Sequence, residues 1–134
     1  MTDPAFDDDD SSRIAAAEAA LAALADTYFE AAQEPIARLN ALARGTLTRE
    51  TADEIYRIAH DFKGQGATFG YDLLTQIGAS LCARMKAHGN NDPATLAPVI
   101  ARHADAFAAV GASAGLKGTG GAEGQRILKA LAER

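Results

Sequence analysis

The sequence predicts an all-α protein: an antiparallel up-down four-helix bundle with a kinked long first helix and a short extra C-terminal helix. Of the 134 residues, 48% are hydrophobic, and alanine dominates this group. Alanine is the best helix former, and the β-branched residues that favour strands are scarce. Apolar residues also recur every three or four positions in segments that Gly, Pro and Asn separate. A single domain of this length can bury a sizeable core.

The first helix is expected over residues 13–44, because Gly45 is well placed to terminate it. Its core-facing positions keep helical spacing and are Leu21, Leu24, Tyr28, Ile36, Leu39 and Leu42. Pro35 must either kink this helix or divide it, and the unbroken phase of the apolar stripe favours a kink. The preceding residues 1–12 contain four consecutive aspartates, so we expect a disordered acidic tail.

The second helix is expected to begin near one of two threonines and to run to about Phe69, with Gly70 closing it. Thr48 could cap the helix directly, whereas Thr51 together with Glu54 matches the spacing of a capping box. At 3.6 residues per turn, one side of this helix forms an apolar stripe of Ile55, Ile58, Phe62 and Phe69.

A third helix is expected over residues 71–88, and a fourth begins at Pro93 or, in the alternative, at Thr95. Gly66 in the second helix and Gly78 in the third fall on core-facing flanks. We expect these two glycines to let a neighbouring helix come close.

The segment 111–124 is rich in Gly, Ser and Thr, and we interpret it as a flexible linker to a short final helix. The domain organisation that follows is an acidic tail (1–12), a four-helix bundle (13–112) and a linker with the C-terminal helix (113–134).

His60 points away from the apolar stripe of the second helix. The same outer face carries Asp53, Tyr56, Arg57, Lys63, Gly64 and Ala67. A neutral imidazole is a competent nitrogen nucleophile, and an ammonium one turn away can neutralise the charge of an arriving phosphoryl group. Gly64, without a side chain, leaves room for a partner. Spacing alone leaves open the alternative that His60 is only a solvated surface histidine.

The run His60-Asp-Phe-Lys63-Gly64, followed by Gly70, resembles the His-x-x-Lys-Gly signature of histidine-containing phosphotransfer (HPt) domains. The resemblance covers roughly residues 20–112. It implies a four-helix bundle that carries a phosphoryl group between receiver-domain aspartates in two-component relays. The family usually has Ser or Ala after the signature glycine, whereas this chain has Gln65 near the edge of the core stripe.

By this resemblance His60 is the phosphoacceptor and Lys63 assists it electrostatically, without a metal ligand in the chain. Tyr56, Arg57, Gly64 and Ala67 would form the face on which a receiver docks, with Gly64 providing clearance. The implied partners are response-regulator receiver domains or a hybrid histidine kinase. No cofactor is expected on this chain, because the Mg²⁺ belongs to the receiver. We expect a phosphoryl carrier rather than a kinase, since no credible nucleotide loop is visible.

Composition argues against several other classes of function. The formal net charge of −5 disfavours nucleic-acid binding, and the sequence contains neither a long apolar span nor the basic start of a signal peptide. We therefore expect a cytoplasmic monomer that does not bind a membrane. The single Cys82 cannot form an internal disulfide; we interpret it as a small core residue rather than a reactive thiol.

The sequence leaves two alternatives to phosphotransfer open. The first is a helical adaptor in which His60 is incidental. The second is a hydrolytic or metal-dependent enzyme that uses His60, His88 and His103. These three histidines fall on different predicted helices and lack the spacing of a helical metal pair. His103 occupies a stripe position, where we expect a hydrogen-bonded histidine at the edge of the core. Phosphotransfer is the favoured function.

Overall fold

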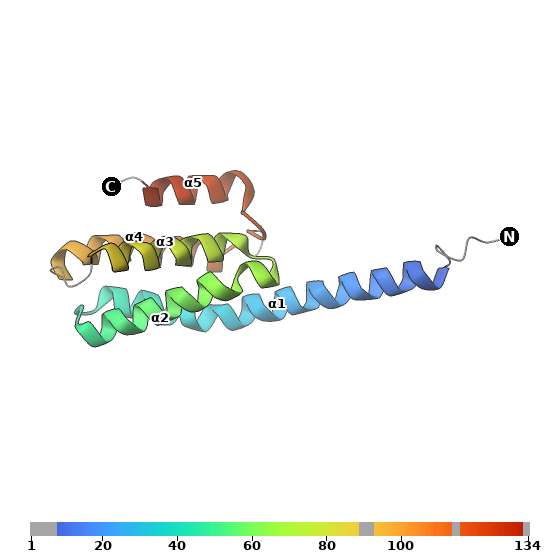
Figure 1. Ribbon diagram of the computed structural model, residues 1–134, viewed down its shortest axis with the longest axis horizontal. Coiled ribbons are helices and arrows are strands. Elements are labelled where there is room, and N and C mark those ends of the chain that lie inside the picture. The colour runs from blue at the N-terminus through green and yellow to red at the C-terminus, as the bar shows by residue number, and fades with distance from the viewer. Residues whose placement is uncertain (1–7, 89–92, 114–115, 133–134) are drawn as a thin grey trace.

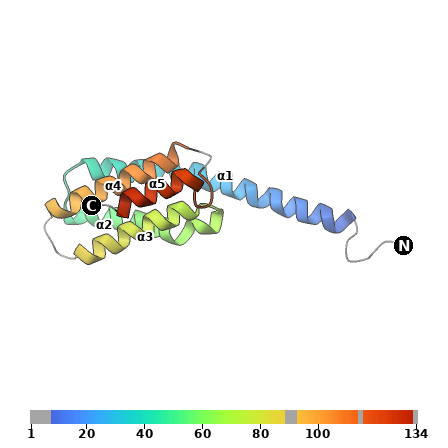
Figure 2. The ribbon, with the colours of Figure 1, turned by 90° about the horizontal axis from the view of Figure 1, so that it is seen from above.

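The computed structural model describes residues 8–88, 93–113 and 116–132. These residues form α1 (Asp8–Arg44), α2 (Arg49–Gln65), the short 3-10 helix η1 (Ala67–Phe69), α3 (Asp72–His88), α4 (Pro93–Gly111) and α5 (Gly121–Ala132). Helices α1 to α4 run alternately up and down, and α5 lies along α3 and α4 (Figures 1 and 2). The described residues contain no strand, and the prediction of an all-α bundle is confirmed.

Helix α1 starts earlier than predicted and extends far beyond the bundle (Figure 1). It begins at Asp8, so residues 8–12, which were predicted to be part of a disordered tail, are helical. It is continuous through Pro35, which therefore does not divide it. Leu21 and Leu24, predicted to face the core, are 65% and 53% exposed. Their periodicity correctly predicted an apolar face, but none of the other elements that the structure describes covers that face.

The start of α2 is fixed by a capping box formed by two threonines. The Thr48 hydroxyl accepts a hydrogen bond from the Thr51 amide at 3.2 Å, and the Thr51 hydroxyl accepts one from the Thr48 amide at 2.8 Å. Direct capping by Thr48 was therefore the better alternative. Glu54, the other candidate for a capping box, instead pairs with Arg38 of α1 at 2.6 and 3.0 Å.

The end of α2 lies earlier than predicted. The α-helix ends at Gln65 and is followed by the 3-10 helix η1. Gly70 then ends η1 in the left-handed conformation, with a φ of +86°. This positive φ is a conformation that favours glycine. Phe69, predicted to lie in the core stripe, is only half-buried and stacks on Tyr28 with ring centroids 4.7 Å apart.

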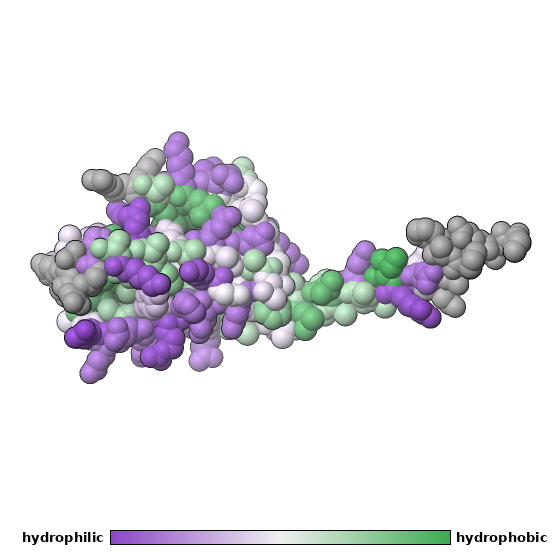
Figure 3. Space-filling model, viewed as in Figure 1, coloured by the Kyte–Doolittle hydropathy of each residue, from purple (hydrophilic) through white to green (hydrophobic). Residues whose placement is uncertain are grey.

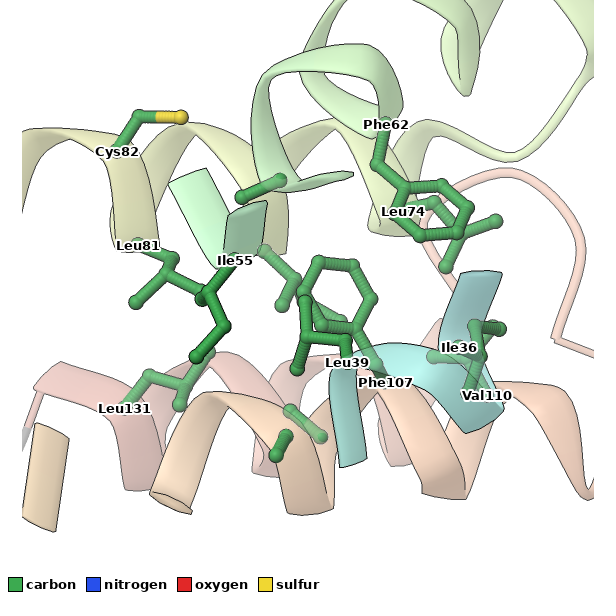
Figure 4. Packing of buried hydrophobic residues seen from close by; sticks show 14 of the residues in the cluster. Ile36, Leu39, Ile55, Phe62, Leu74, Leu81, Cys82, Phe107, Val110 and Leu131 are labelled. Atoms are coloured by element: carbon green, nitrogen blue, oxygen red, sulfur yellow. The ribbon is translucent and has the colours of Figure 1, made fainter. Parts of the chain in front are cut away.

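All four bundle helices contribute to one hydrophobic core (Figure 4). Its central members are Ile36, Leu39, Ile55, Phe62, Leu74, Leu81, Phe107 and Val110. The rings of Phe62 on α2 and Phe107 on α4 lie 4.9 Å apart and join opposite sides of the bundle. Helix α5 adds Leu131 to this core.

The segment before α5 is not a free linker, contrary to the prediction. Gly118 donates a backbone hydrogen bond to Gly70 at 2.6 Å and accepts one from Leu73 at 2.8 Å. Leu116 is buried beside them. Residues 121–124, predicted to be loop, form the first turn of α5. The Gly-rich composition of this segment predicted a flexible linker. Composition does not reveal that the backbone of Gly118 pairs with residues far away in the chain.

Candidate functional site

His60 lies exposed on the outer face of α2, as the spacing predicts. Its ring stacks on Tyr56, one turn earlier, with centroids 6.2 Å apart and an interplanar angle of 29°. Within the part of the chain that the structure describes, the imidazole makes neither a hydrogen bond nor an ion pair. Both ring nitrogens are therefore available to a reactant arriving from solvent.

Lys63 and Gly64 complete the turn that follows His60. Both residues are exposed, and Lys63 has no ion-pair partner among the described residues. A Cβ added at Gly64 would meet no heavy atom within 4 Å. The space beside the imidazole is thus open, and no carboxylate of the described residues neutralises the Lys63 ammonium.

The rotation of α2 about its axis is set by the residues on its opposite face. Ile55, Ala59 and Phe62 are buried, and they alternate with the exposed residues at helical spacing. Because the core fixes this face, the helix holds the imidazole outward on a rigid support.

Helix α3 lies directly against the turn of α2 that carries His60. A Cβ added at Gly78 would fall 2.5 Å from the Ala59 carbonyl oxygen and 2.8 Å from the Lys63 amide nitrogen. The next contact toward the start of α2 joins the Cys82 thiol and the Tyr56 carbonyl oxygen at 4.0 Å. The surface next to His60 is therefore completed by α3. The sequence marked Gly78 for close packing but did not indicate which helix it would meet.

The predicted docking residues lie on two sides of His60. Tyr56 lies toward α3, where its carbonyl meets Cys82, and Ala67 is exposed at the start of η1. Arg57 instead lines a hollow of about 250 Å³ between α1 and α2. The Arg38–Glu54 pair also lines this hollow, and its hydrogen bond holds the pKa of the Glu54 carboxyl below its ordinary value.

Cys82 behaves as a core residue. It is 2% exposed, and burial raises the pKa of its thiol, partly offset by the positive charges of Lys63 and Lys86. A raised pKa keeps the sulfur protonated and poorly nucleophilic.

The other two histidines do not join the site. His103 is fully buried on α4, where its Nδ1 lies 2.7 Å from the Val99 carbonyl oxygen and its Nε2 lies 2.8 Å from the Ser80 hydroxyl. His88 lies in the last turn of α3. In the described ranges no group of three or more His, Cys, Asp or Glu side chains could hold a metal ion.

This geometry defines a class of protein: a helical bundle that displays an exposed imidazole, that of His60, from the middle of a bundle helix. Comparison with protein families places the chain within that class. The family model for the Hpt domain matches residues 23–113, and the chain therefore belongs to the Hpt-domain family. No curated protein and no solved structure matches it.

Membership implies histidine phosphotransfer in phosphorelays and interaction with receiver and kinase domains. The matched residues run from the bundle half of α1 to the end of α4. They leave out residues 8–22 of α1 and all of α5. Among the described residues, no helix combines the length and the apolar character needed to cross a bilayer.

Proposed function

We propose that this protein accepts a phosphoryl group on His60 from the aspartate of one receiver domain and passes it to the aspartate of another. The observation that carries the proposal is the exposed imidazole of His60, with an unpaired ammonium at Lys63 and open space at Gly64. The buried histidine, His103, offers no comparable access.

The chemistry needs little from the protein beyond position and charge. The unprotonated ring nitrogen attacks phosphorus while the bond from phosphorus to the aspartyl oxygen breaks, and the carboxylate leaves with that electron pair. The imidazole becomes a phosphoimidazolium that keeps its other N–H, so no proton has to be removed in this step. Transfer onward is the reverse reaction with a second carboxylate. Mg²⁺ is expected in the acidic pocket of the receiver.

Lys63 would act through its charge. The transferring phosphoryl group spreads negative charge over its equatorial oxygens, and a nearby cation stabilises that charge. Lys63 sits three residues after His60, so the two side chains share one face of α2. Its exposure gives a modest effect, because water screens the interaction.

The docking surface would consist of the exposed face of α2 and the adjoining edge of α3. Tyr56 supplies an apolar contact, Gly64 and Ala67 keep the surface low, and the glycine at position 78 draws α3 close to this face. Arg57 adds positive charge on the α1 side. The alternative, a helical adaptor, predicts an apolar patch on some helix face, and the exposed large hydrophobic residues of the described chain lie on α1 rather than on α2 beside His60.

A two-receiver relay tests this function. A donor receiver carrying ³²P on its aspartate is mixed with the full-length protein and a second receiver. We expect label to reach the second receiver only when the wild-type protein is present. The His60→Gln variant should keep the helical fold and stop transfer, whereas the His88→Gln control should transfer normally. Transfer through His60→Gln at the wild-type rate would contradict the proposal.

A further inference from the structure

The projecting start of α1 carries an apolar face that no other described residues cover. Among the described residues, the large hydrophobic side chains that are exposed are Ile14, Leu21 and Leu24, at 55%, 65% and 53%. The start of α1 extends beyond the bundle (Figures 1 and 2), and all three residues precede Ala25 and Tyr28, where the side chains of α1 begin to pack against the core. Apolar surface is visible along this part of the helix (Figure 3). An isolated helix of this length is only marginally stable in water, so covering this face would stabilise it.

The spacing of these residues is that of a coiled-coil seam. Ile14, Leu21 and Tyr28 follow one another at seven-residue intervals, and Ala17 and Leu24 interleave with them at the same interval. The resulting alternation of three and four residues is the a/d pattern by which two helices pack side by side.

We propose that two copies of this chain pair through residues 10–28 of α1 in an antiparallel, two-fold symmetric contact. This pairing makes the seam complementary to itself. Ile14 lies opposite Leu24 of the second copy, and Ala17 lies opposite Leu21. Each pairing occurs twice because of the two-fold axis, so the exposed Ile14, Leu21 and Leu24 each have an apolar counterpart and the small alanine makes room for a leucine.

The position of the bundle determines the direction of pairing. Tyr28 belongs to the same face as Ile14 and Leu21, and it stacks on Phe69 at the end of the bundle. A parallel second helix would continue along this face into the space that the first copy's own bundle fills. In an antiparallel pair, the second helix continues into its own bundle in the opposite direction. The two bundles therefore lie at opposite ends of the paired helices.

Charge at the edge of the bundle agrees with this arrangement. In the antiparallel contact, Asp10 at the start of one helix lies opposite Tyr28 of the second copy. Lys117 lies at the same end of the bundle: it pairs with Asp26, two residues before Tyr28 on α1, at 3.5 Å, and its side chain is 52% exposed. The acidic start of one helix is therefore brought to the end of the bundle that carries this lysine in the second copy.

The size of the contact indicates a weak dimer. Residues 10–28 span about 28 Å of helix, and an apolar stripe about 100° wide on a helix about 10 Å across is about 9 Å wide. The two copies together would bury about 500 Å², below the roughly 1,000 Å² of a stable specific interface. We expect a dissociation constant in the micromolar to millimolar range. The proposal replaces the expectation of a monomer and is independent of phosphotransfer at His60.

Cysteine cross-linking tests the direction of pairing in full-length protein with Cys82→Ala. Ile14→Cys and Leu24→Cys chains, distinguished by mass tags, are mixed at high concentration and oxidised. We expect the mixed 14–24 disulfide to exceed either homodimeric disulfide about tenfold. The control pair, Ala16→Cys with Ala23→Cys, lies away from the seam and should give only background. Homodimeric 14–14 and 24–24 disulfides as the main products would overturn the antiparallel contact.

Sedimentation equilibrium tests the dimer itself. Wild-type protein should show reversible self-association as its concentration rises to about 1 mM. Leu21→Glu should remain monomeric throughout this range, while Ala19→Glu on the opposite face should associate like wild type. Both substitutions are at exposed positions, so the melting of the bundle should not change. A wild-type monomer at about 1 mM, or undiminished association of Leu21→Glu, would overturn the proposal.

Discussion

Two histidines of this chain show how surroundings decide what one side chain can do. His103 has both ring nitrogens occupied, by the Val99 carbonyl and the Ser80 hydroxyl, inside a closed core. His60 faces solvent with no hydrogen-bond partner in the described residues, and the Tyr56 ring lies beside it. The helical phase of the sequence predicted both placements, because an imidazole on the apolar stripe must be buried and one opposite it must be exposed.

Lys63 is expected to accelerate transfer through its charge. Lys63→Ala should slow phosphotransfer about tenfold, and Lys63→Arg should slow it less because the positive charge is kept. The side chain is exposed, so the melting temperature should stay at the wild-type value. Rapid-quench measurement of transfer from a phosphorylated receiver gives the rates. Equal rates for Lys63→Ala and wild type would remove Lys63 from the mechanism.

Gly64 is expected to matter for access rather than for stability. A Cβ there meets nothing, so Gly64→Ala should be neutral or slightly stabilising through helix propensity. Gly64→Leu should block the approach to His60 and reduce transfer strongly with little change in melting temperature. Transfer rate and thermal midpoint are measured on the same samples. Normal transfer by Gly64→Leu would show that the position is not a clearance site.

His103 should make the bundle less stable in mild acid. Burial, reinforced by the charges of Arg84 and Arg102, lowers the pKa of His103 from its ordinary value of 6.5. Below that pH the His103 imidazole binds a proton in the unfolded chain but stays neutral in the folded chain until the lower folded pKa is reached. The contribution of His103 to stability is therefore present above pH 6.5 and is lost as the pH falls through the folded pKa. Urea unfolding between pH 7.5 and about 5 should show this loss for wild type and a flatter profile for His103→Gln. Parallel profiles would contradict it.

At the level of elements, the crossing of α2 and α3 supports the site. Gly78 of α3 touches the α2 backbone between Ala59 and Lys63. At the other end of the crossing, the Thr75 hydroxyl accepts a hydrogen bond from the Ala67 amide at 2.7 Å and donates one to the Phe62 carbonyl at 3.3 Å. These contacts fix the end of the helix that displays His60.

Gly78→Ala should therefore destabilise the protein, unlike Gly64→Ala. The added methyl group meets backbone atoms at 2.5 and 2.8 Å, which cannot move aside as a flexible side chain could. Overpacking of this kind costs about 1–3 kcal/mol of unfolding free energy. Chemical denaturation of the two alanine variants compares them directly. Equal stability of Gly78→Ala and wild type would mean that the two helices can separate without cost.

The boundaries of elements were less predictable than their existence. Periodicity predicted all four bundle helices. It did not determine whether Thr48 or Thr51 caps α2, and it did not predict the 3-10 helix η1 after α2. Both outcomes depend on a local competition among backbone hydrogen bonds. The sequence also could not predict that α3 adjoins the face that carries His60. Helical spacing indicates which face of a helix is buried, but not which other helix covers it.

At the scale of the whole molecule, the same limit explains the errors at the two ends. Leu21 and Leu24 continue the apolar phase of the bundle, so the sequence alone placed them in the core, although the bundle ends before them. The linker at Gly118 looked flexible by composition, although its backbone pairs with Gly70 and Leu73. Each error concerns contact between segments far apart in the chain, which a periodic pattern does not encode.

The most direct test of the account is to locate the phosphoryl group on the wild-type protein. After brief exposure to a phosphorylated receiver, the protein is digested at neutral pH and its peptides are analysed by mass spectrometry. We predict one modified peptide containing His60, whose phosphoryl group is lost in acid and survives in alkali, as a phosphoramidate requires. ATP and Mg²⁺ without a receiver should leave this peptide unmodified. An acid-stable modification, or a phosphoryl group on a peptide without His60, would contradict the central claim.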